Sequence, residues 1–169
     1  ELRSKGRNCC WGYNFDWQNR VLRLPRFSPN IICTTFAGNA FLDAYGSSDE
    51  KEYLDVARSA GHFILEEIPV TAEGDSLCFS YTTMRRDQVH NANLLGAAYL
   101  ARLYAVTHDA RFLEPACRAV RYSVRRQLAD GSWAYGESGI QRWIDNFHTG
   151  YNLLALKRFS EYAGNNEYE

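Results

Sequence analysis

Two kinds of helical segment alternate along the chain, and they differ in how their apolar residues are distributed. Residues 30–45 carry almost no charge and have a helical composition. Residues 49–68 instead place apolar side chains on one helical face, at Tyr53, Ala57, Ala60 and Ile64. Apolar positions three and four residues apart predict an amphipathic helix. The pattern therefore predicts a hairpin of two helices in this region.

The same order of segments recurs further along the chain. Residues 93–107 are nearly all apolar, and residues 109–128 follow with a stripe formed by Phe112, Ala116, Val120 and Val124. A third copy begins at His148 and carries the apolar residues Tyr151, Leu153, Leu154, Leu156 and Phe159. It reaches a turn at Gly164-Asn165 and ends in residues that resemble the start of another second helix. About two and a half hairpins are predicted.

Between the hairpins lies a repeated aromatic triplet. It reads Trp11-Gly-Tyr13, then Phe79-Ser-Tyr81, then Trp133-Ala-Tyr135. The spacing from Phe79 to Trp133 is 54 residues, which leaves room for two helices in each period. A period of this size with two helices is typical of helical-hairpin repeats.

The contrast between the helices predicts two layers. A helix that is apolar all round must be packed on all sides, whereas a striped helix faces water on one side. The first helix of each hairpin is the apolar one, so we expect an inner ring of first helices and an outer ring of second helices. The fold class is all-α, an incomplete (α/α) toroid, with an open solenoid as the alternative. Residues 1–169 form a single repeat domain, which we expect to be a fragment of a larger toroid or to associate with itself.

Composition and charge narrow the choice of partners and compartment. The net charge of -1 on 169 residues provides no broad field for nucleic acid or for an anionic membrane. No apolar run approaches the roughly 20 residues that span a bilayer. The five cysteines are odd in number and form no C-x-x-C pair, which favours buried thiols in a reducing compartment. We therefore expect a cytoplasmic protein that binds neither nucleic acid nor membrane.

One short stretch resembles the terpenoid-cyclase and prenyltransferase toroids. Gln127-Leu-Ala-Asp-Gly131-Ser-Trp133 is similar to their Gln-and-Trp repeat motif, in which the two side chains tie one hairpin to the next. The resemblance implies an isoprenoid ligand. The acidic D-x-D-D run of squalene-type cyclases does not occur in this chain, so isoprenoid processing is the weakest functional interpretation.

A second resemblance covers more of the chain. The hairpin repeat, together with Trp143-Ile-Asp145-Asn-Phe-His148-Thr-Gly150, is similar to the α/α-toroid proteins of carbohydrate metabolism. These include six-hairpin glycosidases, uronate epimerases and helical toroids of polysaccharide biosynthesis. The resemblance implies a sugar or glycan ligand in a central cavity, and possible activity as a glycoside hydrolase or a sugar epimerase.

The candidate chemistry lies in two motifs with the same D-x-x-H spacing. They are Asp87-Gln-Val-His90 and Asp145-Asn-Phe-His148, and each stands before a predicted inner helix. Arginines precede both motifs, at Arg85, Arg86 and Arg142. Inner helices of a toroid start at the same end of the ring, so we expect both motifs at the mouth of the cavity. Helix N-termini and arginines there would bind an acidic sugar.

Several roles remain open for these residues. Asp87 and Asp145 suit the acid and base of glycoside hydrolysis, whereas His90 and His148 suit proton transfer in epimerisation. Alternatively, each Asp caps a helix and each His braces a loop. Because the motifs lie on separate loops, we expect no metal ion, and no cofactor is implied.

Aromatic side chains in the loops are the remaining candidates for substrate binding. Trp133, Tyr135 and Trp143 could form a floor on which sugar rings stack, with the segment 11–17 completing the rim. Recurrence at the repeat period also fits packing between hairpins, but Trp143 has no counterpart in the other copies. The leading interpretation is a carbohydrate-active or glycan-binding toroid. The alternative is a non-catalytic repeat scaffold.

Overall fold

The computed structural model describes residues 3–164, and the helices occur where the apolar pattern predicts them. Within that range the helices are α1 (Ile31–Ser48), α2 (Lys51–Glu66), α3 (His90–Thr107), α4 (Ala110–Val124) and α5 (Asn146–Ala163). The start of a further second helix, expected after Gly164, lies outside the described residues.

The inner helices all end in the same way. The residues after α1, α3 and α5 are Asp49, His108 and Gly164, and each adopts the left-handed conformation. Their backbone N–H groups bond back to the last turn of the helix, as from Asp49 to the Tyr45 carbonyl at 2.8 Å. Such a cap satisfies an otherwise unpaired carbonyl and reverses the chain toward the next helix.

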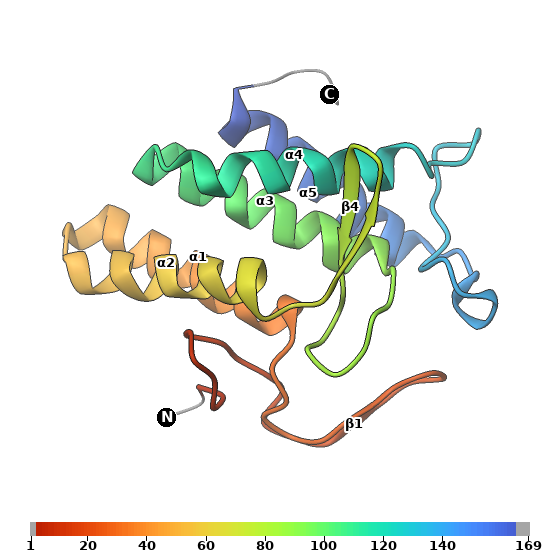
Figure 1. Cartoon of the computed structure of the whole chain (residues 1–169), viewed down its shortest axis with the longest axis horizontal. Helices are drawn as coiled ribbons and strands as arrows, with labels where there is room; N and C mark the ends of the chain where they lie inside the picture. The colour runs from red at the N-terminus through yellow and green to blue at the C-terminus, as the bar shows by residue number, and fades with distance from the viewer. Residues whose placement is uncertain (1–2, 165–169) are drawn as a thin grey trace.

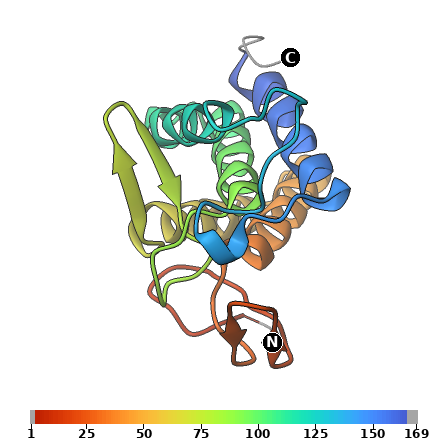
Figure 2. The same cartoon turned by 90° about the vertical axis from the view of Figure 1, so that its right-hand side faces the viewer.

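The helices form two layers, as the contrast in their apolar patterns predicts. Helices α1, α3 and α5 lie side by side in an inner layer, and α2 and α4 pack behind them (Figures 1 and 2). The central helix, α3, contacts all four of the others. Nearly every side chain in its first three turns is buried, which explains why this segment carries almost no charge. The arrangement is an arc of an (α/α) toroid.

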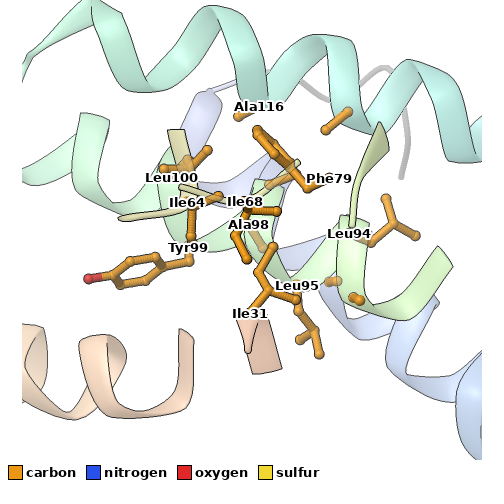
Figure 3. Close-up of a cluster of buried hydrophobic side chains, with 14 of the residues drawn as sticks. Ile31, Ile64, Ile68, Phe79, Leu94, Leu95, Ala98, Tyr99, Leu100 and Ala116 are labelled. Atoms are coloured by element: carbon orange, nitrogen blue, oxygen red, sulfur yellow. The ribbon is translucent and has the colours of Figure 1, made fainter. Parts of the chain in front are cut away.

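The core fills the space between the two layers. Figure 3 shows Ile31 from α1, Ile64 from α2 and Leu94 from α3 among the buried side chains that meet there. Tyr99 is also buried, and its hydroxyl donates a hydrogen bond to the Ala57 carbonyl of α2 at 2.7 Å. A Cβ on Gly38 would lie 2.2 Å from that hydroxyl, so α1 needs glycine at this crossing.

The prediction of an all-α fold is only approximate, because two small antiparallel sheets connect the helices. Strands β1 (Trp17–Gln18) and β2 (Arg23–Leu24) form one, and β3 (Val70–Glu73) and β4 (Ser76–Phe79) form the other. All four residues of β4 are buried, and the strand packs on α4. The burial of β4 comes from contact with a distant helix, so this strand lacks the alternating pattern that reveals a strand in the sequence.

Helix α5 exposes part of its surface as apolar side chains. Its buried residues face α3, whereas Phe147, Leu153 and Leu154 remain exposed. That this face is covered by further hairpins or by a second copy of the chain stays a prediction. Among residues 3–164, no helix combines the length and the hydropathy that a membrane span requires.

Candidate functional site

The aromatic triplets place the first residues of the inner helices α1 and α3. The Tyr81 carbonyl accepts a hydrogen bond from the Ile31 N–H at 3.0 Å, and the Tyr135 carbonyl accepts one from the His90 N–H at 3.1 Å. Tyr81 and Tyr135 are therefore equivalent, one repeat apart. Each ties its own hairpin junction to the start of the preceding inner helix, which explains the recurrence of the triplet.

A cavity of about 280 Å³ opens at the N-terminal ends of the three inner helices. We call it the aromatic pocket. Most of its lining is aromatic, from Tyr13, Trp17, Phe36, Tyr81, Tyr135, Trp143, Phe147, His148 and Tyr151. The other lining side chains are Asn19, Ile32, Asn91 and Leu95. Tyr13 and Trp17 belong to the segment expected at the rim, and both line this pocket.

Two parallel ring stacks shape the pocket. Tyr135 and Trp143 lie with ring centroids 4.3 Å apart and planes 13° from parallel. Trp17 and Tyr81 are 6.2 Å apart and 2° from parallel, and the Tyr81 hydroxyl lies 2.9 Å from that of Tyr13. Burial raises the pKa of Tyr13, Tyr81 and Tyr135, so all three phenols stay neutral. The walls are therefore flat and able to form hydrogen bonds at their edges, and the Arg20 guanidinium lies 5.5 Å from the centroid of the Trp143 ring.

Asp145 both caps α5 and orients His148. Its Oδ1 accepts a hydrogen bond from the His148 N–H at 2.7 Å, and its Oδ2 accepts one from Trp143 Nε1–H at 3.0 Å. The same Oδ2 lies 2.6 Å from Nδ1 of His148. Partial burial opposes ionisation, but the hydrogen bonds and charge attraction of His148 lower the pKa of Asp145 overall. The ionised carboxylate accepts the Nδ1 proton, so Nε2 is the ring nitrogen left for a ligand.

Asp87 is placed differently, although its motif has the same spacing. Its side chain is only 6% exposed and accepts hydrogen bonds from the Tyr81 N–H at 2.7 Å and from Arg85 Nε at 3.2 Å. Burial raises its pKa, and the two hydrogen bonds oppose the rise. Asp87 lines a second cavity, of about 260 Å³, together with Arg85 and Arg86. Its contacts brace the loop that leads into α3.

His90 points away from the aromatic pocket, toward α4. It is 1% exposed, with Nδ1 3.1 Å from Ser123 Oγ and Nε2 2.8 Å from Glu137 Oε1. Burial lowers its pKa, although the hydrogen bond and charge of Glu137 oppose this. Glu137 is half-buried and also lies 3.8 Å from Arg126. His90 thus joins a buried network between α3, α4 and the following loop.

The expected common position of the two D-x-x-H motifs is therefore wrong. Asp145 is the residue that caps α5, but the residue before α3 is Val89, two positions after Asp87. The equivalent of Asp145 in α1 is Asn30, whose side chain accepts from the Cys33 N–H at 2.8 Å. The motifs share a spacing but differ in phase relative to the helix start. Their side chains consequently point to different places.

The structure places only some of the other predicted substrate-binding residues at the aromatic pocket. Tyr135 and Trp143 line the aromatic pocket, whereas Arg142 is exposed on the outside and lies 3.9 Å from Glu137. Trp133 is 1% exposed, and its Nε1–H donates to the Ser123 carbonyl at 2.8 Å. It is a core residue with no surface to offer a ligand. Asn91 also lines the aromatic pocket, and no sequence signal marked it as a lining residue.

Comparison with solved structures shows that two carbohydrate-processing enzymes share the fold of this chain. A GH76 α-mannanase from Bacteroides thetaiotaomicron matches 92% of the chain with a TM-score of 0.63 and 15% identity. An unsaturated glucuronyl hydrolase from Bacillus sp. GL1, responsible for degradation of glycosaminoglycan, matches 86% with a TM-score of 0.61 and 15% identity. The chain spans only 48% and 43% of these two proteins. No protein-family model and no curated protein sequence matches it.

The comparisons confirm the resemblance to toroids of carbohydrate metabolism at the level of the fold. They do not assign roles to single residues. In residues 3–164, no three His, Cys, Asp or Glu side chains come together as a possible metal site.

Proposed function

We propose that this chain binds a carbohydrate in the aromatic pocket, as part of an α/α toroid. The observation that carries the proposal is the pairing of two flat ring stacks with an oriented histidine at the mouth of the inner helices. The Tyr135–Trp143 stack offers a surface for the C–H face of a sugar ring. His148 Nε2 offers a hydrogen-bonding atom for one of its hydroxyls.

The proposal is for binding rather than for hydrolysis by these residues. Glycoside hydrolysis requires two carboxylates flanking the scissile bond. Among residues 3–164, the lining of the aromatic pocket includes no Asp or Glu, and Asp87 faces a different cavity. Asp145 acts on the pocket through His148, whose ring it orients. The position of His148 is nevertheless suited to proton transfer, should a substrate place a proton donor beside Nε2.

The type of sugar follows from the lining. Pockets of this kind combine apolar walls with a few well-placed polar groups, and they select ligands of matching shape. Among residues 3–164, no Arg or Lys lines the aromatic pocket, although Arg20 lies over the Trp143 ring, and this lining favours a neutral sugar ring there. Arg85 and Arg86 line the neighbouring second cavity, where an acidic substituent of a longer glycan would be bound.

Tryptophan fluorescence of the 169-residue chain provides the test, because Trp17 and Trp143 both line the aromatic pocket. The ligands would be the methyl glycosides of mannose, glucose, galactose and glucuronic acid, together with an α-linked mannobiose. We expect saturable binding of at least one of them. Replacing Trp143 with Ala should weaken it by roughly threefold to tenfold, since an aromatic stack is lost.

The control variant is Ile144→Ala, in the same loop. Ile144 is exposed and does not line the aromatic pocket, so its replacement should leave binding unchanged. Absence of binding to every sugar in the panel would contradict the proposal. Equal effects of Trp143→Ala and Ile144→Ala would show that the loop, and not the ring stack, is responsible.

A further inference from the structure

Asn91 has an unused hydrogen-bonding capacity at the aromatic pocket. It lies in the first turn of α3, is 8% exposed and lines the pocket. Its Oδ1 is buried and has no hydrogen-bond partner among the described residues. A buried amide oxygen without a partner is costly, because it has given up its hydrogen bonds to water.

A nearby asparagine on the same helix provides the contrast. The Oδ1 of Asn93 accepts from the Phe79 N–H at 2.9 Å. Its Nδ2 donates to the Ala119 carbonyl at 2.8 Å and to Ser123 Oγ at 2.9 Å. Both polar atoms of the Asn93 side chain are therefore hydrogen-bonded, and these bonds join α3 to α4 and β4. Asn91 makes no comparable contact, so packing of the described residues does not explain an amide at that position.

The surroundings of Asn91 favour an apolar residue unless a ligand is present. Ile32 and Leu95 line the same pocket, and Leu95 lies one helical turn further along α3. A leucine at position 91 has the same number of side-chain heavy atoms as asparagine, in the same branched arrangement, and would leave no polar atom unpaired. The amide thus has a cost in the empty pocket that a suitable ligand would remove.

We propose that Asn91 recognises two adjacent hydroxyl groups of the bound sugar, an inference that rests on the proposed carbohydrate binding. A primary amide presents an acceptor oxygen beside an NH₂ donor. A vicinal diol presents the complementary pair, because one hydroxyl donates while the oxygen of the next accepts. The terminal torsion of asparagine is broad, so a small rotation brings Oδ1 to the pocket beside Nδ2.

This assignment defines the ligand class more closely than the aromatic walls do. Ring stacks alone accept any flat or apolar face, including that of an isoprenoid or an aromatic compound. Asn91 on α3 and Nε2 of His148 on α5 add polar groups from two inner helices. A site built to bond hydroxyls discriminates against analogues that lack them, because its own polar groups are then left unpaired. The ligand is therefore a ring with a free vicinal diol.

The test uses the methyl glycoside that binds the wild-type chain most tightly in the fluorescence panel. Its affinity would be compared with that of the same glycoside carrying methyl ethers on two adjacent hydroxyls, for each adjacent pair in turn. At one pair, methylation should weaken binding to the wild-type chain by about tenfold or more, from loss of the paired hydrogen bonds. Equal binding of all the methylated forms would overturn the inference and leave carbohydrate binding intact.

Asn91→Leu provides the second arm. We expect it to weaken binding of the free glycoside by about tenfold and to leave the affinity for the sensitive methylated form nearly unchanged. Its thermal midpoint should equal or exceed that of the wild type, because an unpaired buried polar atom is removed. A lower midpoint with unchanged affinity would make Asn91 a structural residue and overturn the inference. If the wild type binds no glycoside at all, the proposed function itself fails.

Discussion

The Oδ2 atom of Asp145 lies 2.6 Å from Nδ1 of His148, and the two residues share the start of α5. The same carboxylate caps the helix through its other oxygen, which accepts from the His148 N–H at 2.7 Å. A single side chain thus determines where the helix begins and which way the imidazole faces. Because His148 lines the aromatic pocket, the structural and functional roles of Asp145 are linked but separable by mutation.

The cap can be tested apart from the charge. Replacing Asp145 with Ala should lower the free energy of unfolding by about 1 kcal/mol, through loss of the cap. Replacing it with Asn should have a much smaller effect, since Asn30 caps α1 in the same way. Urea denaturation measures both. If Asp145→Asn is as damaging as Asp145→Ala, the charge beside His148 contributes more to stability than the cap does.

Stability should depend on pH through His90. Burial lowers its pKa in the folded chain, so between that pKa and the ordinary value near 6.5 the unfolded chain binds more protons. Stability is therefore expected to fall as the pH falls through this window. The charged groups that face His90 are Glu137, at 2.8 Å, and Arg126, which contacts Glu137.

The variant His90→Gln removes this titration. Its free energy of unfolding should be lower than that of the wild type near pH 8, because the contacts with Ser123 and Glu137 are disturbed. Between about pH 7 and pH 5, it should lose less stability than the wild type does. Urea denaturation at several pH values gives the two slopes. Identical slopes would mean that other groups account for the acid sensitivity.

Two glycines of α1 allow a controlled test of how closely this helix packs against its neighbours. A Cβ on Gly38 would meet the Tyr99 ring and hydroxyl, whereas a Cβ on Gly46 would have no neighbour within 4 Å. Gly38→Ala should therefore destabilise the chain by about 1–3 kcal/mol through overpacking. Gly46→Ala should stabilise it by up to about 1 kcal/mol, since alanine is the better helix former. Thermal unfolding of both variants distinguishes these opposite signs.

Replacing Trp133 tests whether this aromatic residue belongs to the core and not to the aromatic pocket. Replacement by Phe removes the hydrogen bond to the Ser123 carbonyl and leaves that acceptor and some volume unfilled. We expect a loss of about 1–3 kcal/mol in the free energy of unfolding. Sugar affinity of the folded variant should stay at the wild-type value. A loss of sugar affinity without a loss of stability would show that Trp133 takes part in ligand binding.

The local pattern of the sequence was sufficient to predict the helices and their two layers. Residues 93–107 are apolar all round because α3 contacts every other helix, and residues 109–128 are striped because α4 covers only one side. These are consequences of burial at each position, and burial leaves a direct trace in residue type. The short strand β4 left no such trace, since its burial depends on a helix that lies more than 30 residues away in the sequence.

The candidate site, like the fold, could be predicted from the sequence only in part. That aromatic residues and an Asp–His motif lie near the start of α5 was visible in the sequence, and Tyr135, Trp143 and His148 do meet at one pocket. Which of two identical D-x-x-H spacings faces that pocket was decided by the phase of each motif relative to its helix start. Successive residues of a helix point about 100° apart. A shift of two positions therefore turned Asp87 and His90 away and brought Asn91 to the pocket, and only the tertiary structure determines that phase.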